Sequence, residues 1–363
     1  MREIRKIALS TGGGDAPGLN AVIRAVVLAA VAQGWEVSGI RRGFGGLLGE
    51  AEILRLDRES VRGITHLGGT ILGTTNRGNP FEWPVALPDG TFEYVDRSDQ
   101  VVAEFRRQQL DALIVIGGDG SLSIACRLAE KGLPIIGVPK TIDNDLAATH
   151  LTFGFHTAVQ TASEALDKLV STAESHERVM VVEVMGRHTG WIALHAGVSA
   201  SADVILMPEI PFDLERVCAK VEERYRSGRR FAIVVVAEGA VPRGGSPTYR
   251  EEPGPGRAAR FGGIADAIAA EITECTGQES RSLILGHLQR GGSPTAYDRL
   301  IALRFGAAAV RLVAQRRFGT MVALDPPDVR AVPLAEAIAE IKRVPLDSDT
   351  VLTARALGIA FGD

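Results

Sequence analysis

Two glycine-rich segments of the chain each stand between a predicted strand and a predicted helix. The first, residues 12–18, follows the apolar run at 7–9. The second, residues 117–121, follows the apolar run at 112–116. The backbone N–H groups of such a turn, beside the positive end of a helix, favour phosphate groups. Two such loops indicate a ligand with more than one phosphate, although each loop alone is equally consistent with a tight strand-to-helix turn.

The second loop also carries a carboxylate, Asp119. A bare negative charge would repel a phosphate unless a cation lay between them, and Mg²⁺ binds phosphate oxygens together with one or two carboxylates. We therefore expect Asp119 to hold magnesium, with an aspartate that hydrogen-bonds its own turn as the alternative. The chain has no Gly-Lys dipeptide and no GxGxxG pattern, so the signatures of P-loop NTPases and of the usual dinucleotide dehydrogenases are absent.

The most specific stretch of the chain is Pro-Lys-Thr-Ile-Asp-Asn-Asp at 139–145, directly after a predicted strand. Two carboxylates two residues apart would be costly in a buried structural turn. Phosphoryl transfer to an alcohol needs a carboxylate that takes the hydroxyl proton and cations that neutralise the moving group. The carboxylates of Asp143 and Asp145 are consistent with a general base that lies beside a negative charge associated with a bound metal ion.

The elements around these loops alternate between β-branched or aliphatic runs and stretches of helical period, which predicts an α/β fold with a mainly parallel sheet covered by helices. Ligands bind at the carboxyl ends of the strands in such sheets. Apolar runs predict buried strands at 7–9, 112–116, 135–138, 179–184, 204–207 and 231–236, and helices are expected over 19–32 and 122–130. Residues 78–97 predict a turn or hairpin, and 241–263 a long mobile surface loop.

Length and charge set limits on the function. The chain has 363 residues and a mass of 38.6 kDa, enough for two lobes. Its 40 basic and 44 acidic residues give a net charge of −4, which offers no electrostatic basis for binding nucleic acid. The longest apolar run is far shorter than the roughly 20 residues that span a bilayer, and the first ten residues lack the pattern of a secretory signal. We expect a cytoplasmic protein without nucleic-acid or membrane partners.

The three cysteines, Cys126, Cys218 and Cys275, show neither a CxxC motif nor a Cys/His cluster at metal-ligand spacing. Their odd number argues against a disulfide framework, and their spacing argues against a zinc site.

Together the motifs resemble one known family. They are Gly-Gly-Asp-Ala-Pro-Gly at 13–18, Gly-Gly-Asp-Gly-Ser at 117–121, Pro-Lys-Thr-Ile-Asp-Asn-Asp at 139–145, Glu-Val-Met-Gly-Arg at 183–187 and Gly-His-Leu-Gln-Arg-Gly-Gly-Ser-Pro at 286–294. In this order they resemble the 6-phosphofructokinase family over residues 5–320. The resemblance implies glycolytic phosphorylation of fructose 6-phosphate at its C1 hydroxyl, to fructose 1,6-bisphosphate, with Mg²⁺ and ATP.

The same resemblance implies two Rossmann-like lobes with mainly parallel sheets and the active site in the cleft between them. The larger, nucleotide-binding lobe would comprise residues 1–154 with part of 289–340. The smaller, sugar-phosphate-binding lobe would comprise 155–288 with 341–363.

Residue roles also follow from the resemblance. Asp143 would take the proton from the C1 hydroxyl beside Thr141, while Asp119 would hold magnesium and Asp145 would support the charge cluster. Arg187 and Arg77 would stabilise the transferred phosphoryl group. Contacts to the sugar hydroxyls would come from Glu238 and from the backbone of Met185 and Gly186. The 6-phosphate would be held by His287, Arg290, Arg178 and Arg281.

Two of these residues, Arg178 and Arg281, would reach in from a neighbouring subunit, so the resemblance implies a homodimer or homotetramer. The nucleotide would lie on Gly14, which is also expected to take part in catalysis, and on Gly117, Gly118, Gly120 and Ser121, with Phe44 beside the base and Lys140 near the phosphates. Structural alternatives remain open for several positions: Phe44 as a core residue, Arg77 as a solvated surface arginine, and Arg178 in an ion pair with Glu177 or Glu174.

The phosphoryl donor depends on two positions. Relatives that use pyrophosphate typically carry Asp and Lys at the positions of Gly120 and Lys140, whereas the common bacterial ATP enzymes carry Gly at both. An Asp at 120 would repel the α-phosphate of ATP by roughly 4 kcal/mol at ~4 Å. Gly120 therefore favours ATP, with pyrophosphate as the alternative, because Lys140 is compatible with either donor and the bulk of Ile124 narrows the space near the nucleotide.

Two other classes of protein compete with this hypothesis. Lipid and NAD kinases share the Gly-Gly-Asp-Gly-Ser/Thr motif but lack the motifs at 139–145 and 286–290. A regulator that keeps the fold without turnover is the second rival, and the presence of the base, the metal carboxylate and both arginines argues against it.

Overall fold

The computed structural model describes residues 3–76, 78–88, 90–251 and 260–363. The chain forms two compact units, each made of two stretches. Unit 1 comprises Met1–His156 and Arg290–Ile341, and unit 2 comprises Thr157–Gln289 and Lys342–Asp363. Within the described part of the chain, no helix is both long and apolar enough to cross a membrane.

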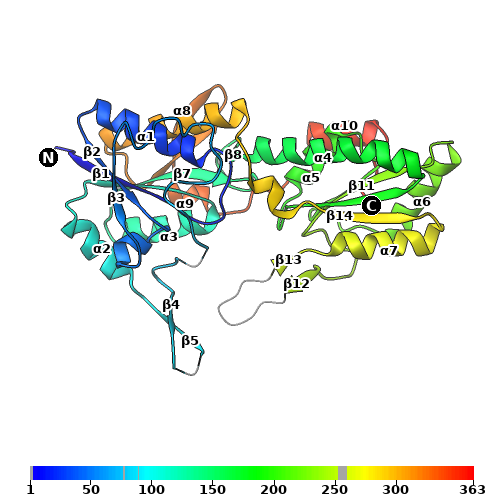
Figure 1. The fold of residues 1–363 in the computed structure, drawn as a ribbon, viewed down its shortest axis with the longest axis horizontal. Coiled ribbons are helices and arrows are strands. Elements are labelled where there is room, and N and C mark those ends of the chain that lie inside the picture. Colours follow the sequence, from blue (N-terminus) through cyan, green and yellow to red (C-terminus); the bar gives the residue numbers. More distant parts are fainter. Residues whose placement is uncertain (1–2, 77, 89, 252–259) are drawn as a thin grey trace. The chain divides into compact units, whose positions relative to one another are not determined.

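Unit 1 contains an eight-stranded sheet with the order β16-β15-β7-β6-β1-β2-β3 and with β8 paired to β7 (Figure 1). Its inner pairs are parallel, and the edge strands β16 and β3 run antiparallel to their neighbours. The strands are β1 (Lys6–Thr11), β2 (Glu36–Ile40), β3 (Ile53–Leu56), β6 (Ala112–Gly117), β7 (Ile135–Thr141), β8 (Phe153–Gly154), β15 (Thr320–Asp325) and β16 (Asp328–Pro333).

Helices cover both faces of this sheet because successive apolar residues of its central strands point to opposite sides. Ile114 and Ile116 belong to a core cluster with α1 and α8, whereas Leu113 and Val115 belong to a cluster with α2, α3 and α9. Figure 1 shows the two sets of helices on opposite sides of the sheet. Their bounds are α1 (Leu19–Ala32), η1 (Gly45–Leu48), α2 (Ser98–Arg107), α3 (Asp119–Glu130), α8 (Ala296–Ala314) and α9 (Leu334–Ala337).

Unit 2 contains a parallel four-stranded sheet with the order β10-β11-β9-β14. One face of this sheet packs against α6 and α7 in a single core cluster. The elements are β9 (Val179–Val184), β10 (Val204–Leu206), β11 (Ala232–Ala237), β14 (Ser280–Ile284), α5 (Trp191–Ser199), α6 (Leu214–Arg226), α7 (Ile264–Thr276), η2 (Gly286–Arg290) and α10 (Asp349–Ala356). Helix α4 (Phe155–His176) begins in unit 1 and continues in unit 2.

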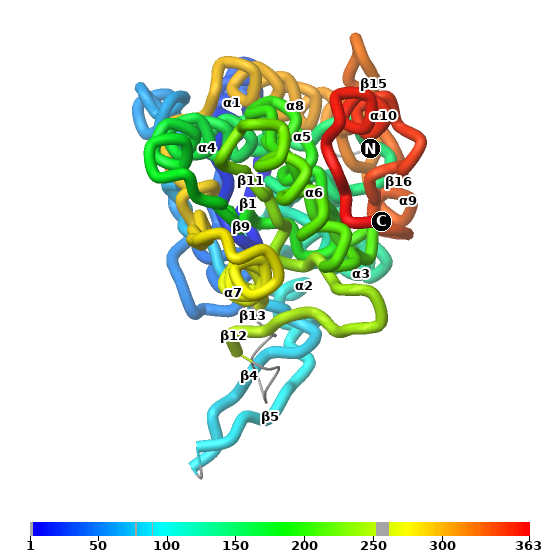
Figure 2. Tube along the Cα trace, turned by 90° about the vertical axis from the view of Figure 1, so that its right-hand side faces the viewer, coloured from blue at the N-terminus to red at the C-terminus, as the bar shows by residue number. Residues whose placement is uncertain are grey.

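The α/β class with mainly parallel sheets is confirmed, and so is the hairpin expected in 78–97. Strands β4 (Trp83–Ala86) and β5 (Phe92–Val95) pair antiparallel and project from unit 1 in Figures 1 and 2. The expectation of a loop throughout 241–263 is wrong, since β12 (Tyr249–Glu251) and β13 (Arg260–Phe261) form a two-stranded ribbon. Residues 252–259 lie outside the described part of the chain.

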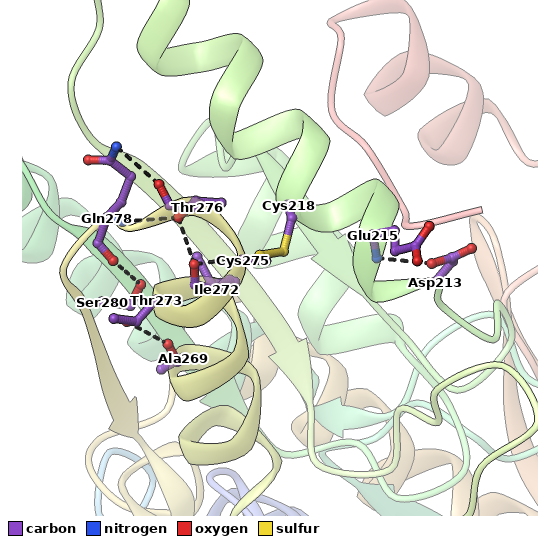
Figure 3. The surroundings of a disulfide bond; sticks show 10 residues. All are labelled: Asp213, Glu215, Cys218, Ala269, Ile272, Thr273, Cys275, Thr276, Gln278 and Ser280. Atoms are coloured by element: carbon purple, nitrogen blue, oxygen red, sulfur yellow. Dashed lines mark hydrogen bonds between the residues drawn. A yellow bond between two sulfur atoms is a disulfide. The ribbon is translucent and has the colours of Figure 1, made fainter.

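The expectation of no disulfide is also wrong. Cys218 of α6 and Cys275 of α7 form a disulfide, with their Cα atoms 6.5 Å apart (Figure 3). The two cysteines are 57 residues apart in the chain, and only the packing of α6 against α7 brings them together. Cys126 has a free thiol. Counting cysteines cannot reveal such a pair, because it depends on the tertiary arrangement of two helices.

Removal of this cross-link should destabilise unit 2. Closing a 57-residue loop restricts the unfolded chain and stabilises the folded state by about 4 kcal/mol in the chain-entropy description. Cys218→Ser should therefore lower the unfolding temperature in calorimetry, whereas Cys126→Ser should leave it nearly unchanged. Unreduced, denatured wild-type protein should titrate one thiol, and a count of three would contradict the disulfide.

Candidate functional site

Three loops of unit 1 meet at one edge of its sheet. Strands β1, β6 and β7 are adjacent and parallel, and they end at Thr11, Gly117 and Thr141. The first glycine loop is joined to β6 by a hydrogen bond of 3.0 Å from the N–H of Gly12 to the carbonyl of Ile116. The sheet topology therefore gathers both glycine loops and residues 140–145 at its carboxyl edge.

The two glycine loops pack around Ser121. This side chain is buried, and a Cβ at Gly117 would collide with it. A Cβ at Gly12 would lie 2.6 Å from the Ser121 Oγ. The hydroxyl of Ser121 thus occupies the space between the loops, which explains why both positions need glycine. Asp119 is exposed as the first residue of α3, where the positive end of the helix dipole lies.

Lys140 connects the first glycine loop to β7. Its side chain is only 3% exposed, and its Nζ donates a hydrogen bond to the carbonyl of Gly14. Burial is the largest cause that lowers the pKa of Lys140 to about 8, and the nearby Arg290 lowers it further. Asp143, Asp15 and Asp119 act in the opposite direction. The Arg290 guanidinium donates to the carbonyl of Asp15 at 3.1 Å, so two cations lie beside this loop.

The loop that carries Asp143 is fixed by polar contacts of its own. The N–H of Asp143 donates to the Thr141 Oγ1 at 3.1 Å. Asn144 has a φ of 51°, and its side-chain oxygen accepts from the N–H of Thr152 at 3.1 Å. The Thr152 hydroxyl donates to the carbonyl of Thr141 at 2.7 Å. Asn144 is a positioning residue that sequence reasoning missed, although asparagine between two aspartates is a signal for left-handed backbone.

Asp145 lies with two other carboxylates in an environment that disfavours ionisation. Burial raises its pKa to about 7, with further contributions from Asp143 and Asp119. One or two of these carboxylates, with their hard oxygen donors, could hold a divalent cation such as Mg²⁺. The described residues contain no group of three or more side chains placed to bind a metal, and Mg²⁺ bound to phosphates needs only one or two carboxylates.

A second group of predicted site residues lies at the carboxyl edge of the unit 2 sheet. Glu238 follows β11, and Met185, Gly186 and Arg187 follow the adjacent β9. The N–H of Gly239 donates to the carbonyl of Gly186 at 3.1 Å. A Cβ at Gly239 would collide with the carbonyl oxygen of Arg187, so this close approach requires glycine.

Gln289 holds the backbone of Met185 in place. It is fully buried, and its Oε1 accepts a hydrogen bond of 3.3 Å from the N–H of Met185. Its Nε2 donates to the carbonyl of Gly286 at 3.1 Å, which also fixes η2. Sequence reasoning missed this residue, although a glutamine inside the motif at 286–294 was a visible signal.

The two arginines expected to act across an interface both pair with Glu279. The Arg178 Nε lies 2.9 Å from a carboxylate oxygen of Glu279, and Arg281 contacts the other oxygen. The interaction with Arg178 is the largest cause that lowers the pKa of Glu279. The alternative ion pair for Arg178 therefore exists, but with Glu279 rather than with Glu177 or Glu174. His287 is exposed on η2.

The structure describes two of the three remaining positions that were expected near the nucleotide and its phosphates, Phe44 and Ile124, and both belong to or pack against the hydrophobic core. Phe44 is 3% exposed and belongs to a core cluster, which favours its alternative role as a core residue over contact with a base. Ile124 is half-buried and packs against the same cluster. Arg77 lies outside the described residues.

The predicted site residues thus fall into two groups. Unit 1 contains Gly14, Phe44, Gly117, Gly118, Asp119, Gly120, Ser121, Lys140, Thr141, Asp143 and Arg290. Unit 2 contains Arg178, Met185, Gly186, Arg187, Glu238, Arg281 and His287.

Comparison with known proteins places this chain in a family. A family profile described as Phosphofructokinase matches residues 6–313. The chain is 54% identical over 359 residues to the "ATP-dependent 6-phosphofructokinase" of Chloroflexus aurantiacus, with 99% of this chain and 98% of the relative covered. The chain belongs to the phosphofructokinase family.

Relatives in this family are named for different phosphoryl donors, ATP or pyrophosphate. The chain is 52% identical over 345 residues to the "Pyrophosphate--fructose 6-phosphate 1-phosphotransferase" of Amycolatopsis methanolica, with 94% of this chain and 96% of the relative covered. Among solved structures, the phosphofructokinase of Pichia pastoris in the T-state matches with a TM-score of 0.80 and 31% identity. That match covers 99% of this chain but 37% of the Pichia chain.

In this phosphofructokinase, replacing Asp145 should change how stability depends on pH. Its folded pKa of about 7 lies above the ordinary value of 3.8 for an aspartate, so ionisation increasingly favours the unfolded state as pH rises from about 4 to about 7. Asp145→Asn cannot ionise, so its unfolding temperature should exceed that of the wild type by a margin that grows over this range and then stays constant. Thermal unfolding in chelator-treated buffer measures the margin.

Asp57→Asn provides a control of opposite sign. The hydrogen bond from the N–H of Ser60 is the main cause that lowers the pKa of Asp57, so the ionised carboxylate stabilises the fold. Asp57→Asn should therefore have a lower unfolding temperature than the wild type at neutral pH. A margin for Asp145→Asn that is independent of pH would show that burial does not hold this carboxyl protonated.

Proposed function

We propose that this protein transfers the terminal phosphoryl group of ATP to the C1 hydroxyl of fructose 6-phosphate. The observation that carries the proposal is the meeting of three loops at the ends of β1, β6 and β7, which brings two phosphate-binding glycine loops together with Asp119, Lys140 and Asp143. The names of relatives such as that of Chloroflexus aurantiacus support it. The reaction would serve glycolysis.

Asp143 would act as the general base. It would take the proton from the C1 hydroxyl while the sugar oxygen forms a bond to the terminal phosphorus and the bond to the ADP oxygen breaks. The side-chain oxygens of Thr141 and Asn144 accept hydrogen bonds from the N–H groups of Asp143 and Thr152 and so hold the Asp143 loop in a defined position, which such proton transfer requires. The N–H groups of the glycine loops, including those of Gly14 and Gly118, would bind phosphate oxygens, and Lys140 would balance their charge.

Asp119 would hold Mg²⁺ at the start of α3, with Asp145 contributing negative charge nearby. The bound cation would neutralise phosphate oxygens as charge moves during transfer. Burial and then the charges of Asp143 and Asp119 raise the pKa of Asp145, and a divalent cation would offset this negative charge.

On unit 2, Glu238 and the backbone of Met185 and Gly186 would bind the sugar hydroxyls, and Arg187 would stabilise the transferred phosphoryl group. The 6-phosphate would be held by His287 and Arg290, together with Arg178 and Arg281 of a neighbouring copy in a homodimer or homotetramer. We place this activity in the cytoplasm, where its sugar phosphate and nucleotide substrates occur.

Pyrophosphate is the second candidate donor. It is supported by Lys140 and by the name of the Amycolatopsis methanolica relative. Gly120 supports ATP, because it is exposed and has no atom within 4 Å of the position that a Cβ would take, which leaves room beside the nucleotide. Competition between ATP and pyrophosphate on one preparation distinguishes the donors.

Loss of the base should remove most of the turnover. Asp143→Asn keeps the shape of the side chain but cannot accept the proton, so kcat should fall by at least about 100-fold, with little change in the KM for fructose 6-phosphate. Asp99→Asn, at an exposed residue that pairs with Lys131, is the control and should keep full activity. A folded Asp143→Asn enzyme at wild-type speed would refute the mechanism.

A negative charge at position 120 should select against ATP. Gly120→Asp should reduce kcat/KM for ATP by about 1000-fold, which corresponds to roughly 4 kcal/mol of repulsion, and should affect pyrophosphate use far less. Gly120→Asn is the matched control because it has the same size without the charge. Equal losses with Asp and Asn, or with both donors, would show that steric bulk rather than charge decides.

A further inference from the structure

Phe261 of β13 lies under the side chain of Arg187. The guanidinium carbon of Arg187 is 4.8 Å from the centre of the Phe261 ring, within the range of a cation–π contact. The ring of His188 lies 6.2 Å from the same ring, edge to face. On the other strand of the ribbon, Tyr249 packs against Phe261 at 4.9 Å. Phe261 is therefore the centre of an aromatic group at the loop that follows β9.

The backbone after Phe261 is tied to the strand that leads to Arg187. The buried carboxylate of Glu183, near the end of β9, accepts hydrogen bonds from the N–H groups of Gly263 at 2.9 Å and Ala265 at 3.1 Å. Figures 1 and 2 both show β13 beside α7, which begins at Ile264. The ring and the Arg187 loop thus share one anchor, four residues from Arg187 along the chain.

A contact of this kind orders an arginine without using its donors. The five N–H bonds of a guanidinium lie in its plane, whereas the ring of Phe261 meets its face. The carboxylate of Glu279, in contrast, contacts guanidinium nitrogens of both Arg178 and Arg281 directly. Stacking therefore restricts the orientation of Arg187 through the face of its guanidinium.

We propose that Phe261 is a positioning residue for phosphoryl transfer, which orients the Arg187 guanidinium through the cation–π contact. The inference rests on the proposed role of Arg187 at the transferred phosphoryl group. It assigns a function to the ribbon formed by β12 and β13, a segment to which sequence reasoning gave none.

The test is a double-mutant cycle between Phe261 and Arg187. Phe261→Leu should lower kcat about tenfold at nearly constant KM, because orientation matters most in the transition state. Phe261→Tyr keeps the ring face and should restore most of the loss. In an Arg187→Ala background, Phe261→Leu should have no further effect on kcat, since the residue acts through Arg187.

Phe231→Leu is the matched control, because Phe231 also stacks with an arginine, Arg224, at 5.0 Å, but neither residue has a predicted role in catalysis. It should leave kcat unchanged. Equal effects of Phe261→Leu in the wild-type and Arg187→Ala backgrounds, or no rescue by tyrosine, would overturn the proposal.

A second measurement separates this inference from the proposed function. In protein labelled with ¹⁵N-arginine, the Nε–H signal of Arg187, identified by its loss in Arg187→Lys, should show a ring-current shift that disappears in Phe261→Leu. An unshifted signal would refute the contact whether or not the enzyme is active. If Arg187→Ala retains full kcat while the shift is present, the proposed role of Arg187 is wrong, and with it the role of Phe261 in transfer.

Discussion

The gathering of three carboxylates at the ends of adjacent parallel strands, where burial and then mutual repulsion raise the pKa of Asp145, is the constraint that dominates this edge of unit 1. Asp119 follows β6, and Asp143 and Asp145 follow β7, so the sheet itself brings them together. Lys140, whose pKa is about 8 because of burial and the nearby Arg290, supplies at most one positive charge beside these three carboxylates. Without a bound ligand, these three carboxylates therefore lower the stability of the folded state. A bound divalent cation would offset this negative charge, so cation binding would stabilise the fold at this edge.

The loops withstand this repulsion because buried polar groups fix their backbone. Ser121 fills the space between the glycine loops, and Asn144 accepts a hydrogen bond from Thr152 while it adopts a left-handed conformation. Gln289 has the same function at the backbone of Met185 in unit 2. The hydrogen bonds of Asn144 and Gln289 act on main-chain N–H groups, so they hold the loops whatever the charge of the neighbouring side chains.

The predictable part of this structure is the part that depends on local sequence. Runs of Val, Ile and Leu were enough to predict buried parallel strands, and the period of apolar residues predicted the helix that became α1. Pairs remote in the chain were not predictable. The disulfide between Cys218 and Cys275, the partner Glu279 of two arginines and the pairing of Tyr249 with Phe261 all depend on which elements pack together. The proposed roles of the site residues rest on the order of the motifs, and Asn144 and Gln289 were missed because their contacts are to backbone.

The arginines differ in what an anion must displace. Arg178 and Arg281 share Glu279, so an anion that binds them competes with a carboxylate whose pKa is lowered by the pairing. Because the Glu279 side chain is 45% exposed, water screens these ion pairs and the competition costs little free energy. The contact between Arg187 and Phe261 differs in kind, since the ring holds the face of the guanidinium. Paired arginines suit a phosphate that binds and leaves intact, and a stacked arginine suits a group whose charge rises only during transfer, when there is no time for a side chain to reorganise.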